Sequence, residues 1–308
     1  MDEFFWEIGG VAHHVLVEGS GPVCVLSAGL AMSWFDWEPV AALLAPYRTV
    51  VRFDRPGHGL SGAARVPPTA AGEAQRIAAV VDAVADLGAV ADLGAGAGAG
   101  VGARVGARAG VDVAGPVTVV GHSIAGFHAE AFARLYPERT ASVVLVDSSV
   151  EPHARVPAAP AVRTAAAGAL GAALVAAGIP AALGPAVRRA AVRGSRARGA
   201  HDPAPTPLVR RTYRTARVLQ GALLENTHYL AVAAELLALR ASRPLPGHVP
   251  VTVLAAYDGR PRRSALRWLD RQRDLADTLA ARFEIASPAG HLLMLDRPER
   301  VAEAVLRG

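Results

Sequence analysis

Short apolar runs alternate along the chain with longer segments in which apolar residues recur every three or four positions. The short runs predict strands at residues 11–17, 23–27, 50–53, 117–120, 143–146, 251–255 and 283–285. The longer segments predict helices at residues 34–44, 69–87, 124–135 and 298–306. This alternation is typical of an α/β fold, in which a mostly parallel central sheet carries helices on both faces.

Two segments interrupt the alternation. Residues 88–115 are rich in glycine and alanine, with the run GAGAGAG and a repeated GAR, and they predict a flexible surface insertion that buries little apolar surface. Residues 151–248 lie between two predicted strands but have helical patterns, so we interpret them as an inserted helical cap. The core would then comprise residues 1–150 and 249–308.

Within the predicted cap, residues 164–187 carry no charge and are long enough to span a bilayer. The segment consists mainly of alanine and glycine and contains Pro180 and Pro185, which gives a weak insertion signal. We interpret it as cap helices that line an apolar pocket and expect no membrane contact. A transmembrane helix or a membrane-surface role is the alternative.

Composition narrows the class of protein. The net charge is +5, and every basic residue apart from histidine is arginine. Arginine is enriched together with alanine, glycine and proline while lysine is missing, which we attribute to codon bias. No groove-reading motif accompanies the positive charge. We therefore expect no nucleic-acid partner. Cys24 is the only cysteine, which excludes an internal disulfide, and the N-terminus lacks the pattern of a signal peptide. We expect a cytoplasmic protein without a metal or an organic cofactor, and the oligomeric state stays open.

The segment VTVVGHSIAGFHAE, residues 117–130, places a serine between a predicted strand and a predicted helix. A serine hydroxyl is a weak nucleophile unless a base accepts its proton, and it has to stand clear of the sheet. The small residues Gly121 and Ala125, two positions before and after Ser123, would permit the tight corner that this requires. The alternative is a serine that only caps the helix.

Five segments together resemble successive landmarks of the α/β-hydrolase family with an inserted cap. They are AGLAMSWFDWEPV, VVRFDRPGHGLS, VGHSIAGFHAEAFARLYPE, VVLVDSS and AGHLLMLDRPE. The resemblance spans nearly the whole chain except the Gly/Ala insertion and most of the cap. Two positions depart from the family pattern: Ala125 replaces the last glycine of G-x-S-x-G, and Ala28 stands where histidine is frequent. A serine nucleophile also argues against the haloalkane dehalogenase and epoxide hydrolase branches, which need aspartate there.

The resemblance implies a set of site residues. Ser123 would be the nucleophile, and the backbone amides of Leu30 and Ile124 would form the oxyanion hole. His291, in the loop after the last strand, would be the general base. For the acid, the family pattern favours Asp258, after the strand at 251–255, and leaves Asp147, at the end of the strand at 143–146, as the alternative. His122 would be structural or pocket-lining, and the loop of His58 would shape the sheet edge.

The sequence thus predicts a serine hydrolase that cleaves a carboxylic ester or related acyl bond of a mainly apolar small molecule. A cofactor-free haloperoxidase, a C–C bond hydrolase and an acyltransferase would use the same triad, because a fold does not fix a function. A non-catalytic protein that binds a small ligand is an alternative from another class.

Overall fold

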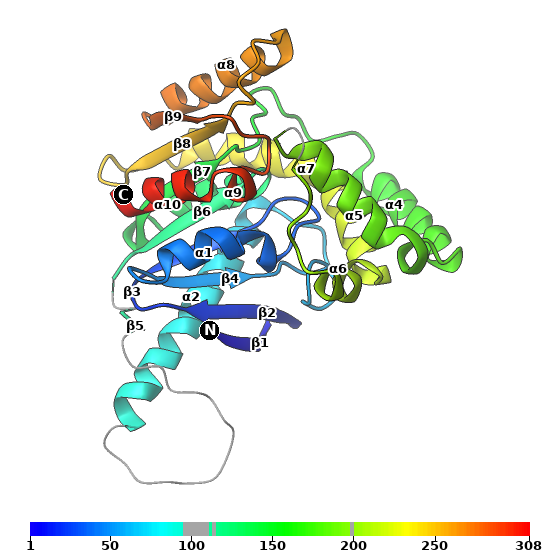
Figure 1. Cartoon of the computed structure of the whole chain (residues 1–308), viewed down its shortest axis with the longest axis horizontal. Coiled ribbons are helices and arrows are strands. Elements are labelled where there is room, and N and C mark those ends of the chain that lie inside the picture. The colour runs from blue at the N-terminus through cyan, green and yellow to red at the C-terminus, as the bar shows by residue number, and fades with distance from the viewer. Residues whose placement is uncertain (95–110, 113–114, 198–199) are drawn as a thin grey trace.

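The computed structural model describes residues 1–94, 111–112, 115–197 and 200–308. Across these residues, nine strands form one sheet with the spatial order β1-β2-β4-β3-β6-β7-β8-β9, and β5 pairs with β3 beside this path (Figure 1). The strands are β1 (Asp2–Ile8), β2 (Val11–Glu18), β3 (Gly21–Ser27), β4 (Thr49–Phe53), β5 (Val111–Asp112), β6 (Val117–His122), β7 (Thr140–Val146), β8 (Val251–Ala256) and β9 (Arg282–Ala286). β1 and β2 pair antiparallel to their neighbours, whereas β4, β3, β6, β7, β8 and β9 run parallel.

The burial of the central strands explains why these strands could be predicted from the sequence. Every residue of β4 and β6 is buried, as expected for parallel strands covered on both faces, and such strands appear as continuous apolar runs. The predicted α/β fold with a mostly parallel sheet is confirmed. β1 was not predicted, because its residues alternate between half-buried and exposed positions and include three acidic side chains.

Helices cover both faces of the sheet. On one face, α1 (Glu38–Leu44), α9 (Leu293–Asp296) and α10 (Pro298–Arg307) contribute to a single apolar core cluster. On the other face, α2 (Ala70–Gly94), α3 (Ala125–Leu135) and α8 (Arg263–Thr278) contribute to a second cluster. Two short 3₁₀ helices, Trp34–Trp37 and Pro137–Arg139, precede α1 and β7. The helix predicted at 34–44 is thus divided, with Pro39 in the first turn of α1.

The described part of residues 151–248, which the sequence assigned to a cap, contains four helices between β7 and β8. These are α4 (Pro160–Ala176), α5 (Ile179–Ser195), α6 (Thr206–Tyr213) and α7 (Ala216–Ser242). In Figure 1, α4, α5 and α6 lie to one side of the sheet, and α7 runs from them to the back of it. A third apolar cluster joins Val209, Tyr213 and Val218 of this insertion to Leu16, Trp34 and Phe35 of the core. The C-terminal half of α7 also packs against α2 and α3 and contributes Val232 and Leu236 to the core cluster on that face.

The segment predicted as a Gly/Ala-rich insertion, residues 88–115, overlaps described elements at both ends. α2 continues to Gly94, and Val111 and Asp112 of β5 pair in parallel with the start of β3. Residues 95–110 and 113–114 lie outside the described residues, and the flexibility expected for them stays a prediction.

The uncharged segment at 164–187 is divided between α4 and α5. Within the described part of the chain, no single helix has both the length and the apolar character needed to cross a bilayer. α4 and α5 meet the criterion only when taken together, and their axes are bent by 104° at the break between them.

Candidate active site

Ser123 occupies a sharp corner between β6, which ends at His122, and α3, which begins at Ala125. Its φ of +55° lies in the left-handed region, which is costly for a residue with a side chain. A Cβ atom at Gly121 would lie 2.2 Å from the Ala125 carbonyl oxygen, and one at Gly126 would lie 2.0 Å from Ser148 Oγ. The tight corner therefore requires glycine at 121 and 126, whereas the fully buried Ala125 methyl group is accommodated.

His291 and Asp147 are brought together from positions 144 residues apart. His291 Nδ1 lies 2.7 Å from Asp147 Oδ2, so Nδ1 carries the proton that it donates to the carboxylate. The other carboxylate oxygen, Oδ1, accepts from the Ala256 backbone N–H at 2.9 Å and from Trp268 Nε1 at 2.8 Å. Asp147 is 2% exposed, whereas the His291 side chain is 39% exposed. A buried carboxylate with three fixed donors can hold the imidazole in one orientation and one tautomer.

Asp258, which the sequence favoured as the partner of His291, does not occupy that position. Its Oδ1 accepts the Arg260 backbone N–H at 2.9 Å, so the carboxylate closes its own turn after β8. Asp258 borders the same shallow surface cavity as Asp147 and His291, but the hydrogen bond to the imidazole comes from Asp147. The topology places Asp147 near the nucleophile, because Asp147 follows β7 and β7 lies directly beside β6, the strand that leads to Ser123.

Trp268 was missed by the sequence reasoning. It projects from α8, a helix whose sequence RSALRWLDRQRDLADT is mostly polar and for which no helix was predicted. The available signal was weak: Leu269, Leu275 and Ala276 share one helical face, but the position between them on that face is the polar Gln272. Nothing in that spacing indicates that an indole N–H reaches a carboxylate at the end of β7.

The loop after β3 approaches the corner closely. A Cβ atom at Gly29 would lie 2.7 Å from His122 Nδ1 and 3.1 Å from Ser123 Cβ, so only glycine lets this loop lie against the serine. Leu30 lines the same cavity as Ser123. The backbone N–H groups of Leu30 and Ile124 have no hydrogen-bond acceptor among the described residues, which leaves both able to donate to a bound oxygen.

His122 connects the corner to the loop of His291. Its Nε2 donates to the His291 carbonyl oxygen at 2.9 Å, and the centroids of the two imidazole rings are 4.7 Å apart. Burial, followed by the neighbouring His291, holds the pKa of His122 well below its ordinary value of 6.5. His122 is therefore a neutral imidazole whose proton is on Nε2.

A cavity of about 400 Å³ lies between the corner and the cap. Ser123 and His291 line it from the core, and α5 and α7 line it from the cap. Its apolar wall includes Leu30, Ile179, Val187, Val192, Val218 and Leu219. No cluster of three or more His, Cys, Asp or Glu side chains that could hold a metal ion occurs in the described residues.

The chain resembles known proteins over nearly its whole length. A sequence profile described as "Alpha/beta hydrolase family" matches residues 24–304. Cfl2 from Burkholderia cenocepacia aligns with a TM-score of 0.70 and 19% identity, covering 99% of this chain and 94% of that one. The enol-lactonase from Burkholderia xenovorans LB400 aligns with a TM-score of 0.61 and 18% identity, covering 98% of each chain.

A thermophilic esterase from Thermogutta terrifontis has a TM-score of 0.60 and 21% identity, covering 100% of this chain and 97% of that one. At these identities the structural likenesses establish the fold. No protein of curated function matches the sequence.

Proposed function

The chain belongs to the alpha/beta hydrolase family, and we propose from the geometry of its site that it is a serine hydrolase acting on a carboxylic ester or a related acyl bond. The observation that carries the proposal is the 2.7 Å hydrogen bond between His291 and Asp147, beside a cavity that His291 lines together with Ser123. Ester cleavage by a serine needs a base that accepts the proton of the nucleophile and an acid that orients the base.

In the proposed reaction, Ser123 Oγ attacks the carbonyl carbon while His291 Nε2 accepts the hydroxyl proton. Asp147 keeps the other ring nitrogen protonated and stabilises the imidazolium that forms. The amides of Leu30 and Ile124 donate to the oxyanion, and His291 returns the proton to the leaving alcohol. A water molecule, deprotonated by His291, then releases the acid from Ser123.

The cavity supports a mainly apolar substrate. Its wall is largely aliphatic, and the two large polar cap side chains that reach it are already engaged. Arg188 donates to Asp36 and is stacked beside Tyr213, whose hydroxyl donates to the Ala31 carbonyl at 2.8 Å. A volume of about 400 Å³ lies within the range of small-molecule sites.

Hydrolysis of aryl esters with graded acyl length tests this proposal, together with labelling by a fluorophosphonate. We expect wild type to be labelled and Ser123→Ala to be neither labelled nor active. Ser195→Ala is the matched control, because Ser195 lines the same cavity from α5 but lies outside the corner. Labelling that persists in Ser123→Ala would overturn the assignment of the nucleophile.

The same panel separates the alternative functions. An acyltransferase would pass the acyl group to an added alcohol or amine faster than to water, which the ratio of ester to free acid among the products measures. A non-catalytic ligand-binding protein would leave the esters intact and the fluorophosphonate unreacted.

A further inference from the structure

Arg55, in the loop after β4, contacts the backbone of the loop that carries Leu30. Its Nη1 donates to the Ala28 carbonyl oxygen, and its Nη2 donates to the Gly29 carbonyl oxygen at 3.2 Å. The guanidinium is 4% exposed. A buried guanidinium with this fork of donors fixes two successive carbonyl groups at once.

The contact with Gly29 has a direct consequence for Leu30. The carbonyl of Gly29 and the N–H of Leu30 belong to one peptide group, which is trans. In a planar trans peptide these two bonds point in opposite directions. A donor that fixes the Gly29 oxygen on one side therefore fixes the direction of the Leu30 N–H on the other. A cation at the oxygen end also polarises the group and makes its N–H a stronger donor.

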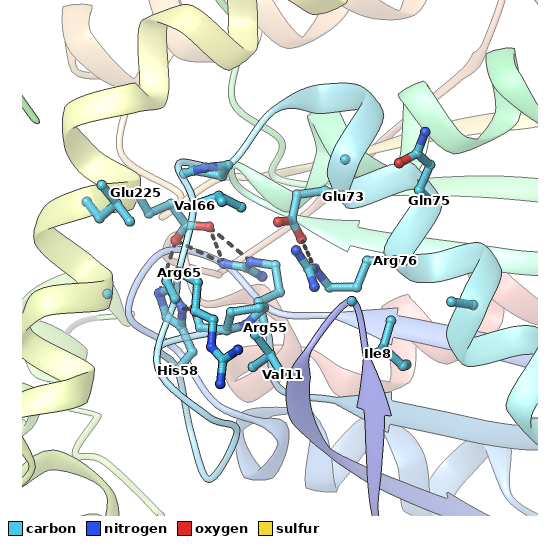
Figure 2. A pocket seen from close by; sticks show the side chains of 18 residues that line it. Ile8, Val11, Arg55, His58, Arg65, Val66, Glu73, Gln75, Arg76 and Glu225 are labelled. Atoms are coloured by element: carbon cyan, nitrogen blue, oxygen red, sulfur yellow. Dashed lines mark hydrogen bonds and ion pairs between the residues drawn. The ribbon is translucent and has the colours of Figure 1, made fainter. Parts of the chain in front are cut away.

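The cap holds Arg55 in place. Glu225 of α7 accepts from Arg55 Nε through Oε1 and from Nη2 through Oε2, both at 3.0 Å. Figure 2 shows this carboxylate reaching toward the guanidinium from α7, with His58 close by. Burial alone would raise the pKa of Glu225, but the charge of Arg55 and the adjacent His58 ring outweigh it and hold that pKa below its ordinary value. The pair is thus an ionised bridge between cap and core.

Backbone packing makes this bridge rigid. A Cβ atom at Gly221, one turn before Glu225 on α7, would lie 2.5 Å from the carbonyl oxygen of Gly57. The cap helix and the Arg55 loop are therefore in direct backbone contact. Arg55 and Glu225 also line a second cavity of about 390 Å³, together with His58, Glu73 and Arg76 (Figure 2).

We propose that Arg55 and Glu225 are positioning residues of the oxyanion hole: Arg55 orients and polarises the Gly29–Leu30 peptide, and Glu225 makes the cap a structural part of that hole. This inference rests on the proposed function, because an oxyanion forms only if Ser123 attacks a carbonyl. Neither side chain contacts the reacting atoms, so both act through the Leu30 amide.

The test compares three variants of the full chain with wild type. Arg55→Met alone removes the guanidinium partner of the buried Glu225 and leaves it only the contact with His58 Nε2 at 3.1 Å, so it is expected to lower the melting temperature strongly. The double variant Arg55→Met with Glu225→Gln removes both charges and is expected to restore much of that loss. Glu235→Gln is the matched control, since Glu235 is on the same helix and accepts from the Ala70 and Ala71 backbone amides instead.

In the double variant, we expect kcat for an aryl ester to fall about 10- to 100-fold with KM within about 3-fold, because one oxyanion donor is worth about 10²–10³ in kcat and is weakened here, not removed. The affinity for an aryl boronic acid should fall by a similar factor. In that adduct Ser123 Oγ forms a bond to boron, and the hydroxyl proton of Ser123 passes to His291. One hydroxyl oxygen of the tetrahedral boronate then occupies the oxyanion hole. Glu235→Gln should leave both quantities unchanged.

A double variant with wild-type kcat and boronate affinity would overturn the proposal, as would an equal loss in Glu235→Gln. If activity returned together with the melting temperature, the pair would be structural only. Failure of the proposed function gives a different result, because wild type itself would then hydrolyse no ester and bind no boronic acid.

Discussion

His122 Nε2 donates to the carbonyl oxygen of His291 at 2.9 Å, so the residue before the candidate nucleophile anchors the loop that carries the candidate base. The bond links the end of β6 to the loop after β9, and its donor is the neutral, buried imidazole of His122. The distance between Ser123 and His291 is thereby constrained by the backbone as well as by Asp147.

His122→Leu should therefore lower kcat/KM for aryl esters about 10-fold or more, because a misplaced base loses part of the proximity effect. His122→Gln retains a side-chain N–H donor and should preserve more of the activity than His122→Leu. Steady-state kinetics at pH 8 checks both, with melting temperatures as the control for folding. Equal losses in the two variants would mean that the hydrogen bond does not position His291.

Asp147→Asn should reduce kcat/KM by about 10³- to 10⁴-fold, since an amide in place of the acid favours the wrong imidazole tautomer. Asp258→Asn should stay within about 3-fold of wild type, because among the described residues its carboxylate accepts from the Arg260 backbone N–H and not from His291. Rates measured side by side with one aryl ester decide between the two acids. A large loss in Asp258→Asn alone would restore the assignment favoured by the family pattern.

The contrast between these two aspartates shows what the sequence could and could not predict. Ser123 follows β6, a fully buried apolar run that is visible without coordinates. His291 follows β9, of which only the last residue is buried, and its place came from the family pattern. Asp147 and Asp258 follow neighbouring parallel strands, so both are placed near the same edge of the sheet. Which of them reaches His291 depends on side-chain direction and on Trp268, and neither leaves a trace in the hydrophobic pattern.

Pairings across the cap are hidden for a similar reason. Arg55 and Glu225 are separated by 170 residues, and the sequence places one in a loop and the other in the predicted cap. A charged residue in such a helix looks solvent-exposed until the packing of α7 on the core is known. The cap could be predicted as an insertion, but its contacts could not.

Trp268→Phe should lower kcat/KM about 10-fold while leaving the fold intact. The substitution removes the N–H that donates to Asp147 Oδ1 at 2.8 Å and keeps most of the aromatic volume. Losing one partner of a buried carboxylate costs about 1–3 kcal/mol, part of which would appear as a less rigid His291. Trp6→Phe, in strand β1 far along the sheet, serves as the control and should have wild-type rates.

Two substitutions at the corner of Ser123 are expected to have opposite outcomes for activity. Gly121→Ala should abolish activity or folding, because its Cβ would meet the Ala125 carbonyl oxygen at 2.2 Å. Ala125→Gly, which restores the usual family pattern, should remain active and lose about 1 kcal/mol of stability through helix propensity and a small void. Urea unfolding and ester hydrolysis measure the two effects. An active, stable Gly121→Ala variant would contradict the close approach described for this corner.

His128, buried in α3 with no hydrogen-bond partner for either ring nitrogen among the described residues, makes stability depend on pH. Burial is the main reason why the pKa of His128 is lowered from 6.5 to about 4. Between pH 6.5 and pH 4, His128 is therefore protonated in the unfolded chain and neutral in the folded chain. Stability from this residue is complete above pH 6.5 and is lost as the pH falls through that window, by roughly 3 kcal/mol.

Replacing His128 by leucine removes the proton that only the unfolded state binds. The free energy of unfolding of His128→Leu should then fall less than that of wild type between pH 7.5 and pH 4.5, as measured by urea titration at each pH. His153→Leu, at an exposed position, controls for the loss of a histidine as such and should follow wild type. Carboxylates also titrate in this range and act equally in all three proteins, so only the difference between the curves reports on His128. Parallel curves for wild type and His128→Leu would show that this imidazole is protonated in the folded state as readily as in the unfolded chain.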